Sequence, residues 1–142
     1  MTAPITGLPG RLRRFRKWIL LACVVAWTGA LTASHLPPQD IPQTGVSDKS
    51  LHFVGFFGLA GAFWLTLAGY GRRTPVRVVL VLLIMPAYAA FDELTQRYFQ
   101  RTADFGDWTW DVIGTAAALL FAEIAMILSA RRARGAGIAR RP

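Results

Sequence analysis

The sequence has few of the residues from which disulfide frameworks and metal clusters are built, with one cysteine and two histidines among 142 residues. Cys23 lies inside an apolar run, so the chain supports neither a disulfide framework nor a cysteine metal cluster, and packing is the expected role of this thiol. His35 and His52 form no HxxxH or HExxH pair. Acidic residues are also scarce, eight against sixteen lysines and arginines. On these grounds we expect no metal and no cofactor.

Long polar stretches are missing as well, and four apolar runs dominate the chain. They cover residues 18–33, 51–70, 76–91 and 112–128, and hydrophobic residues make up 54% of the sequence. A soluble domain of this size could not bury so much apolar surface. The sequence therefore predicts an all-α, polytopic membrane protein, a bundle of four transmembrane helices in the lipid bilayer with no separate soluble domain. The shorter runs reach only about 24 Å, so flanking residues must complete each span.

Lysine and arginine are distributed unevenly around the four runs. Only three lie in the loops after the first and third runs, namely Lys49, Arg97 and Arg101. The other thirteen flank the opposite ends of the runs: Arg11, Arg13, Arg14, Arg16, Lys17, Arg72, Arg73, Arg77, Arg131, Arg132, Arg134, Arg140 and Arg141. Because basic residues near helix ends resist translocation, we expect both termini to be cytoplasmic and the membrane to be the inner (plasma) membrane.

This distribution divides the chain into a basic cytoplasmic N-terminal tail (residues 1–17), a four-helix membrane domain (18–130) and a basic cytoplasmic C-terminal tail (131–142). A net charge of +8 would suggest nucleic-acid binding in a soluble chain. Here the charge flanks the spans, so we expect anchoring at anionic headgroups and no nucleic-acid partner. The first run could be a cleavable signal peptide, but Leu31 is a poor −3 residue and we expect the run to be retained. The ends, residues 1–10 and 135–142, are expected to be irregular.

Seven of the eight acidic residues lie on the side opposite the thirteen basic ones. They are Asp40, Asp48, Asp92, Glu93, Asp104, Asp107 and Asp111. Asp48 and His52 are four residues apart, so they share a helix face on which the carboxylate can orient the imidazole. The three last aspartates, spaced by three and four, form another face that Gly114 continues into the membrane. Ionisable groups converging from three helices are hard to explain by solvation alone, and they predict a polar site.

On these residues the chain resembles the VanZ-like family of membrane proteins, over residues 34–118. The family pattern begins with Ser-x-x-Pro-Pro and continues with Asp-Lys-x-x-His-Phe, Asp-Glu-x-x-Gln, and an arginine followed by spaced aspartate, asparagine and glycine. The matching positions are Ser34, Pro37 and Pro38; Asp48, Lys49, His52 and Phe53; Asp92, Glu93 and Gln96; and Arg101, Asp107 and Gly114. The resemblance implies a small envelope protein linked to tolerance of teicoplanin-type glycopeptides, without defining a reaction.

Three positions depart from this family pattern. Asp111 stands where the pattern has asparagine, Phe56 where a tyrosine is expected, and Gln100 where glycine usually precedes the arginine. The carboxylate at position 111 adds a negative charge, which requires a nearby cation, a bound proton or a metal. A metal held by His52, Asp48, Glu93 and Asp107 is conceivable, but no linear motif supports it.

Three functions remain open for the polar site. In the first, the protein binds or modulates an envelope component through Lys49, Gln96, Arg101, Asp107 and Asp111. In the second, it is a membrane-embedded enzyme acting on a lipid-linked or cell-wall substrate by acid/base chemistry, with His52, Glu93 and Asp48 as the candidate catalytic residues. In the third, the polar groups only hold short helices together. We favour the first, because binding demands less of the geometry than turnover.

Three residues outside this set carry separate predictions. Glu123 lies about 12 Å into the fourth span, and a pair with Arg77 or a protonated carboxyl is favoured over a proton pathway. His35, in a proline-rich loop, is expected to face solvent. Gly114, followed by a small residue four positions later, is expected to serve tight helix packing and not dimerisation.

Overall fold

The structure, a computed structural model, describes residues 8–37, 39 and 45–138, and all regular elements among them are helices. Asp40, Arg140 and Arg141, which belong to the predicted charge pattern, lie outside this range. The helices are α1 (Leu8–Ser34), α2 (Asp48–Gly69), α3 (Thr74–Gln96) and α4 (Phe105–Ile138), and the short 3-10 helix η2 (Arg97–Phe99) follows α3. The prediction that the chain ends are irregular is wrong for residues 8–10 and 135–138, which are helical.

All four α-helices are long and apolar enough to cross a membrane, which confirms the predicted fold class. The candidate spans contain 25, 22, 26 and 29 residues. At about 1.5 Å per residue, even the shortest covers a hydrocarbon core of about 30 Å. Residues that flank the apolar runs extend the helices to this length, as expected from runs too short to cross the hydrocarbon core.

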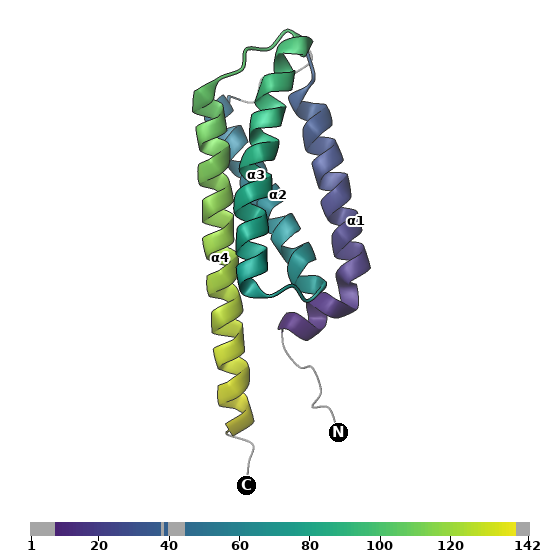
Figure 1. The fold of residues 1–142 in the computed structure, drawn as a ribbon, viewed down its shortest axis with the longest axis vertical. Coiled ribbons are helices and arrows are strands. Elements are labelled where there is room, and N and C mark those ends of the chain that lie inside the picture. Colours follow the sequence, from purple (N-terminus) through teal and green to yellow (C-terminus); the bar gives the residue numbers. More distant parts are fainter. Residues whose placement is uncertain (1–7, 38, 40–44, 139–142) are drawn as a thin grey trace.

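The helices lie side by side along one axis and alternate in direction (Figure 1). The first turns of α1 and the last turns of α4 are therefore at the same end of the bundle, together with the α2–α3 loop. This end carries the described members of the basic set. The other end carries η2 and the start of α4. Ser47 begins α2 there, because its hydroxyl accepts a hydrogen bond from the Ser50 amide at 3.3 Å.

A buried apolar core joins α2 to its neighbours, while the outer surface is also apolar. The buried residues are Leu12, Phe56, Leu59, Ala60, Trp64, Ala68, Val81, Met85, Ala89, Ala118 and Leu119. Many large apolar side chains face outwards, among them Val25, Leu83 and Phe121, each more than 60% exposed. An outer surface of this kind fits lipid and not water.

The backbones of α2 and α4 approach each other closely at Gly114. A Cβ atom at this position would collide with the Phe53 carbonyl oxygen and lie 3.2 Å from the Phe57 amide nitrogen. Glycine at this position therefore allows the two helix backbones to touch, as small residues do in membrane bundles. This packing lies within one chain, in agreement with the expectation of tight packing.

A second feature of the interior is the ion pair between Arg77 of α3 and Glu123 of α4. The Arg77 Nη2 atom lies 3.1 Å and 3.2 Å from the two carboxylate oxygens, and Nε lies 3.3 Å from Oε1. Trp64 of α2 donates its indole N–H to the same Oε1 at 2.8 Å, and its ring lies 4.9 Å from the guanidinium carbon. Of the two alternatives favoured for Glu123, the structure shows the pair with Arg77, and the hydrogen bond from Trp64 adds a third helix to it.

The contact at Gly114 predicts that Gly114→Ala weakens the fold. Because a backbone carbonyl would have to move, we expect the free energy of unfolding to fall by about 1–3 kcal/mol. Unfolding of the purified protein in micelles by a denaturing detergent measures this change. Gly58→Ala is the matched control, since a Cβ there meets no atom within 4 Å. Equal stability of the two variants would contradict the packing argument.

The ion pair predicts that Glu123→Ala is more harmful than loss of the whole pair. The single change leaves the Arg77 guanidinium partly buried without its carboxylate, and we expect a cost of about 3 kcal/mol. The double variant Arg77→Met/Glu123→Met removes both charges and should unfold at a higher detergent fraction than Glu123→Ala. A double variant that is less stable than the single variant would refute a mainly electrostatic role for the pair.

Candidate functional site

His52 lies one turn into α2, at the end of the bundle opposite the basic residues. Its side chain is 9% exposed. Phe53, the next residue, is the one whose carbonyl contacts Gly114 of α4. The close approach of the two helix backbones therefore brings the imidazole within reach of the side chains at the start of α4.

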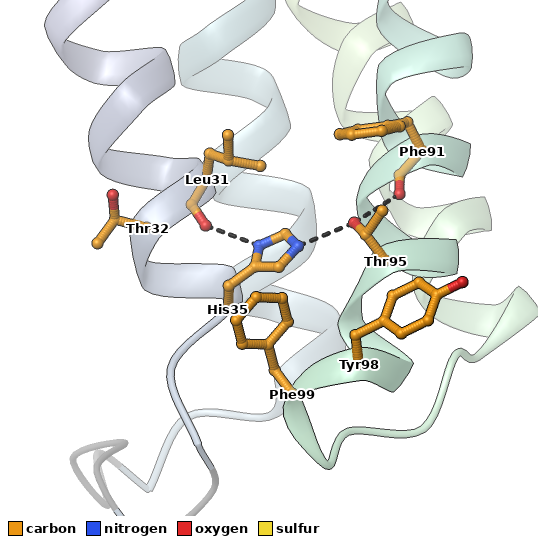
Figure 2. A pocket seen from close by; sticks show the side chains of 7 residues that line it. All are labelled: Leu31, Thr32, His35, Phe91, Thr95, Tyr98 and Phe99. Carbon is orange, nitrogen blue, oxygen red and sulfur yellow. Dashed lines mark hydrogen bonds between the residues drawn. The ribbon is translucent and has the colours of Figure 1, made fainter.

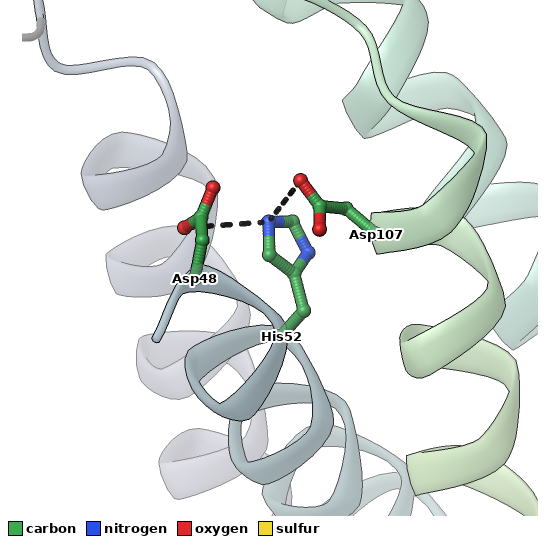
Figure 3. Close-up of side chains that lie close together, drawn as sticks. All are labelled: Asp48, His52 and Asp107. Atoms are coloured by element: carbon green, nitrogen blue, oxygen red, sulfur yellow. Dashed lines mark ion pairs between the residues drawn. The ribbon is translucent and has the colours of Figure 1, made fainter. Parts of the chain in front are cut away.

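Four carboxylates surround the His52 ring. On one side, Nδ1 lies 3.0 Å from Asp111 Oδ1, in a hydrogen bond, and 3.7 Å from Glu93 Oε1. On the other side, Nε2 lies 3.9 Å from Asp48 Oδ1 and 3.9 Å from Asp107 Oδ2, and Figure 3 shows the ring between these two residues. We call these five residues, which come from α2, α3 and α4, the His52 cluster.

Local helix geometry places the α4 members of the cluster. Asp104 precedes α4 and caps it, because its Oδ1 accepts a hydrogen bond from the Gly106 amide at 2.7 Å. Asp107 and Asp111 follow at spacings of three and four, so they lie on one face, which is turned towards α2. The Asp104 amide in turn donates to Glu93 Oε2 at 3.0 Å and thereby connects the start of α4 to the end of α3.

The deeper half of the cluster is the more buried. Asp111 is fully buried and Glu93 is 5% exposed. One oxygen of each carboxylate, Asp111 Oδ2 and Glu93 Oε1, has no hydrogen-bond partner among the described residues. Buried carboxylates normally have all their oxygens satisfied, since an unpaired one costs free energy. Four carboxylates around one imidazole also leave an excess of negative charge, so the cluster favours a bound proton or another cation.

A separate polar network lies on the α1 side of α3. Ser34 donates to Asp92 Oδ1 at 2.7 Å, and the Gln96 amide donates to Asp92 Oδ2 at 3.1 Å. His35 Nδ1 lies 2.8 Å from the Leu31 carbonyl oxygen, and Nε2 lies 2.8 Å from Thr95 Oγ1 (Figure 2). We call Ser34, His35, Asp92, Thr95 and Gln96 the Asp92 network. It connects the end of α1 to the end of α3.

Two residues are thus found elsewhere than the sequence suggested. The expectation that His35 faces solvent is wrong, because its side chain is 13% exposed and both ring nitrogens are engaged. The reason is that α1 ends at Ser34 and the chain turns at once towards α3. Gln96, grouped with the binding residues in the sequence, belongs to the Asp92 network and is 2% exposed.

The two basic residues among the binding candidates, Arg101 and Lys49, differ in their contacts within the chain. Arg101 donates to the Ser34 carbonyl at 3.0 Å, and its Nη2 lies 3.6 Å from Asp48 Oδ2. It therefore joins the Asp92 network to the His52 cluster and is already engaged within the chain. Lys49 is exposed at the start of α2. An anion clamp made of both side chains is thus not preformed.

An open groove of ≈ 420 Å³ lies beside the Asp92 network. It is lined by Leu31, Thr32, His35, Phe91, Thr95, Tyr98 and Phe99 (Figure 2). The lining is mostly apolar, and its imidazole, that of His35, bonds within the protein. The groove faces the outer surface between α1 and α3 and does not include members of the His52 cluster.

Two of the departures from the family pattern have a clear structural setting. Gln100 has φ 60° and ψ 26°, in the left-handed region that glycine adopts without a Cβ penalty, so a side chain there costs about 1–2 kcal/mol. Phe56 is buried, and its ring centroid lies 5.7 Å from that of Tyr88. The third departure, Asp111, supplies the shortest contact of the His52 cluster.

Linear motifs gave no sign of the roles of Ser34, His35 and Thr95. The only available signal was the Ser-x-x-Pro-Pro pattern, which marks Ser34 without saying what it binds. Chemically, the His52 cluster can hold a cation between its carboxylates or exchange protons through the imidazole. The Asp92 network has the shorter and more complete hydrogen bonds of a structural element.

Comparison with known proteins agrees with the arrangement of helices and motifs. Residues 17–127, well over half of the chain, match the VanZ/LLP1 family. No curated protein and no solved structure matches the chain. With its four candidate spans and the motif residues gathered at one end of the bundle, the chain belongs to the VanZ/LLP1 family.

Proposed function

We propose that this protein resides in the bacterial plasma membrane with both termini in the cytoplasm, and that its His52 cluster binds a polar part of a cell-envelope component at the extracytoplasmic face. The proposed orientation rests on the basic residues, which by their positions in the sequence lie near the start of α1, in the α2–α3 loop and near the end of α4. Figure 1 shows these three segments at one end of the bundle. Arginines at helix ends are retained on the cytoplasmic side. The His52 cluster is at the opposite end.

The observation that carries the proposal is that three helices bring four carboxylates within 4 Å of one partly buried imidazole. Such a set is costly next to lipid, and ionisable groups in spans are usually functional. The cluster is also incomplete, because Asp111 and Glu93 each have an oxygen with no hydrogen-bond partner in the part of the chain that the structure describes. A structural network of the Arg77–Glu123 kind has its carboxylate oxygens bonded.

The outward side of the cluster offers charges of both signs to such a component. The Asp48 side chain is 55% exposed, and Lys49 beside it is exposed too. A lipid headgroup or cell-wall fragment reaching the membrane surface could contact both. A role in tolerance to teicoplanin-type glycopeptides, which the family resemblance suggests, fits a protein that binds such a component.

Acid/base catalysis on a lipid-linked or cell-wall substrate is the second candidate function. It is supported by the position of the His52 ring, both nitrogens of which have carboxylates within 4 Å. An imidazole oriented by carboxylates can accept and donate protons. In this case Glu93 would assist as the second acid or base, and Asp48 would orient the ring.

The test of the proposal is complementation of a deletion strain. We expect loss of the gene to increase susceptibility to a teicoplanin-type glycopeptide, and the unaltered chain to restore tolerance. His52→Gln and Glu93→Gln keep the side-chain volume but remove the charge and acid/base capacity of these positions, so they should fail to restore it. Growth inhibition over a drug dilution series provides the measurement, with immunoblots of membranes to establish equal abundance.

The control for this experiment is Arg97→Gln, at the same end of the bundle but outside the cluster. Arg97 is exposed and contacts Tyr98, and its loss should leave tolerance intact. Full tolerance with His52→Gln at normal abundance would refute the proposed site. If both cluster variants instead disappear from the membrane while Arg97→Gln remains, the cluster is structural.

A further inference from the structure

We propose that the deeper half of the His52 cluster is a binding site for one divalent transition-metal ion of the zinc type, with His52 Nδ1, Glu93 and Asp111 as its ligands. The inference goes beyond the proposed function, because the ion would be held whether or not an envelope component binds. The sequence predicted no metal. The three donors of the proposed site come from three helices, so no linear spacing could have indicated it.

The spacing of the donor atoms fits an ion. One ligand atom from each of His52, Glu93 and Asp111 lies within 4.8 Å of the other two. Nδ1 is 3.0 Å from Asp111 Oδ1 and 3.7 Å from Glu93 Oε1. Bonds of about 2.1 Å at tetrahedral angles put two ligand atoms about 3.4 Å apart, between these two values. Small side-chain rotations would therefore complete the geometry.

The unpartnered oxygens point independently to a ligand in this place. Glu93 Oε1 and Asp111 Oδ2 belong to side chains that are more than nine-tenths buried, and neither oxygen has a hydrogen-bond partner among the described residues. Glu93 Oε1 is the oxygen nearer to the imidazole, 3.7 Å from His52 Nδ1. A cation placed there would satisfy both carboxylates.

The charges favour a divalent ion over a proton alone. The three proposed ligands, a neutral imidazole and the carboxylates of Glu93 and Asp111, together carry a charge of −2, which a divalent ion cancels. Protonation of the imidazole would leave these three side chains with a charge of −1. Neutrality matters here because the site borders lipid, where uncompensated charge is costly. In the family pattern residue 111 is asparagine, so the second carboxylate is a feature of this chain.

The other side of the ring provides the support that metal-binding histidines usually have. A histidine that coordinates through one nitrogen commonly donates the N–H of the other to a carboxylate, which fixes the ring. Asp48 and Asp107 lie 3.9 Å from Nε2 and can serve in this way (Figure 3). They form a possible second ligand set with His52, but Asp48 is exposed, and so we place the ion on the buried side. One nitrogen and two carboxylates suit Zn²⁺ or Mn²⁺ and leave at least one coordination position open.

The test is metal binding by the full chain, purified in detergent with its affinity tag removed and stripped with a chelator. Equilibrium dialysis against ZnCl2, and separately against MnCl2, followed by elemental analysis should give about one ion per chain for at least one metal. Asp111→Asn, which restores the residue of the family pattern, should weaken binding at least about tenfold. The ion should also raise the melting temperature of the unaltered chain more than that of this variant.

Asp104→Asn is the matched control, because it removes an exposed carboxylate at the same end of the bundle but outside the His52 cluster, and asparagine caps a helix as well as aspartate does. It should retain the affinity. Uptake of neither metal by the unaltered chain, or equal binding by Asp111→Asn, would overturn the inference, and so would a loss confined to Asp104→Asn. If Asp111→Asn is not monodisperse, Glu93→Gln takes its place with the same expected loss. The complementation assay tells the two proposals apart. If Asp111→Asn fails to bind metal but still restores normal glycopeptide tolerance, the metal site is supported and is not needed for the proposed function.

Discussion

Lipid offers no partner to an ionisable side chain, so every such group within the spans depends on other groups of the same chain. The two ends of the bundle meet this constraint differently. Near the basic end, Glu123 accepts hydrogen bonds from Arg77 and Trp64, and both of its oxygens are engaged. Near the other end, the His52 cluster has more carboxylates than cations. The Glu123 arrangement is complete without a ligand, whereas the His52 cluster favours the binding of a cation.

The packing of α2 against α4 makes the second arrangement possible. Gly114 allows the α4 backbone to touch the Phe53 carbonyl, and His52 is the residue before that carbonyl. The capped start of α4 then presents Asp107 and Asp111 to the ring. The same feature thus serves stability and the site, because a larger side chain at position 114 would separate the helices that share the His52 cluster.

Much of the fold could be predicted because each apolar run carries its own evidence. Run length and the charged flanks predicted four spans. The helices differ from the predicted runs mainly because they extend further at their ends. The depth of Glu123 along α4 favoured a pair with Arg77 or a protonated carboxyl over a proton pathway, and the structure shows the pair. The acidic end of the bundle was likewise visible in the distribution of charge.

The division of the polar residues into two groups could not be predicted from spacing. Asp92 and Glu93 are neighbours in one motif, but neighbours on a helix point about 100° apart. Asp92 therefore faces α1, where Ser34 bonds to it, and Gln96, one turn further along α3, bonds to the same carboxylate. Glu93 instead faces α2 and α4. His35 was misjudged for a related reason, because a proline-rich stretch suggests exposure without showing that the first residue of the loop returns to α3.

Contact between the His52 cluster and an envelope component requires the His52 end of the bundle to face the outside of the cell. Labelling of intact cells with a membrane-impermeant thiol reagent tests this most directly, because the native Cys23 is buried. A cysteine at exposed Thr102 (Thr102→Cys) should be labelled without lysis, whereas one at exposed Arg73 (Arg73→Cys) should react only after the cells are opened. The reverse pattern would contradict the orientation and, with it, the proposed contact with the envelope.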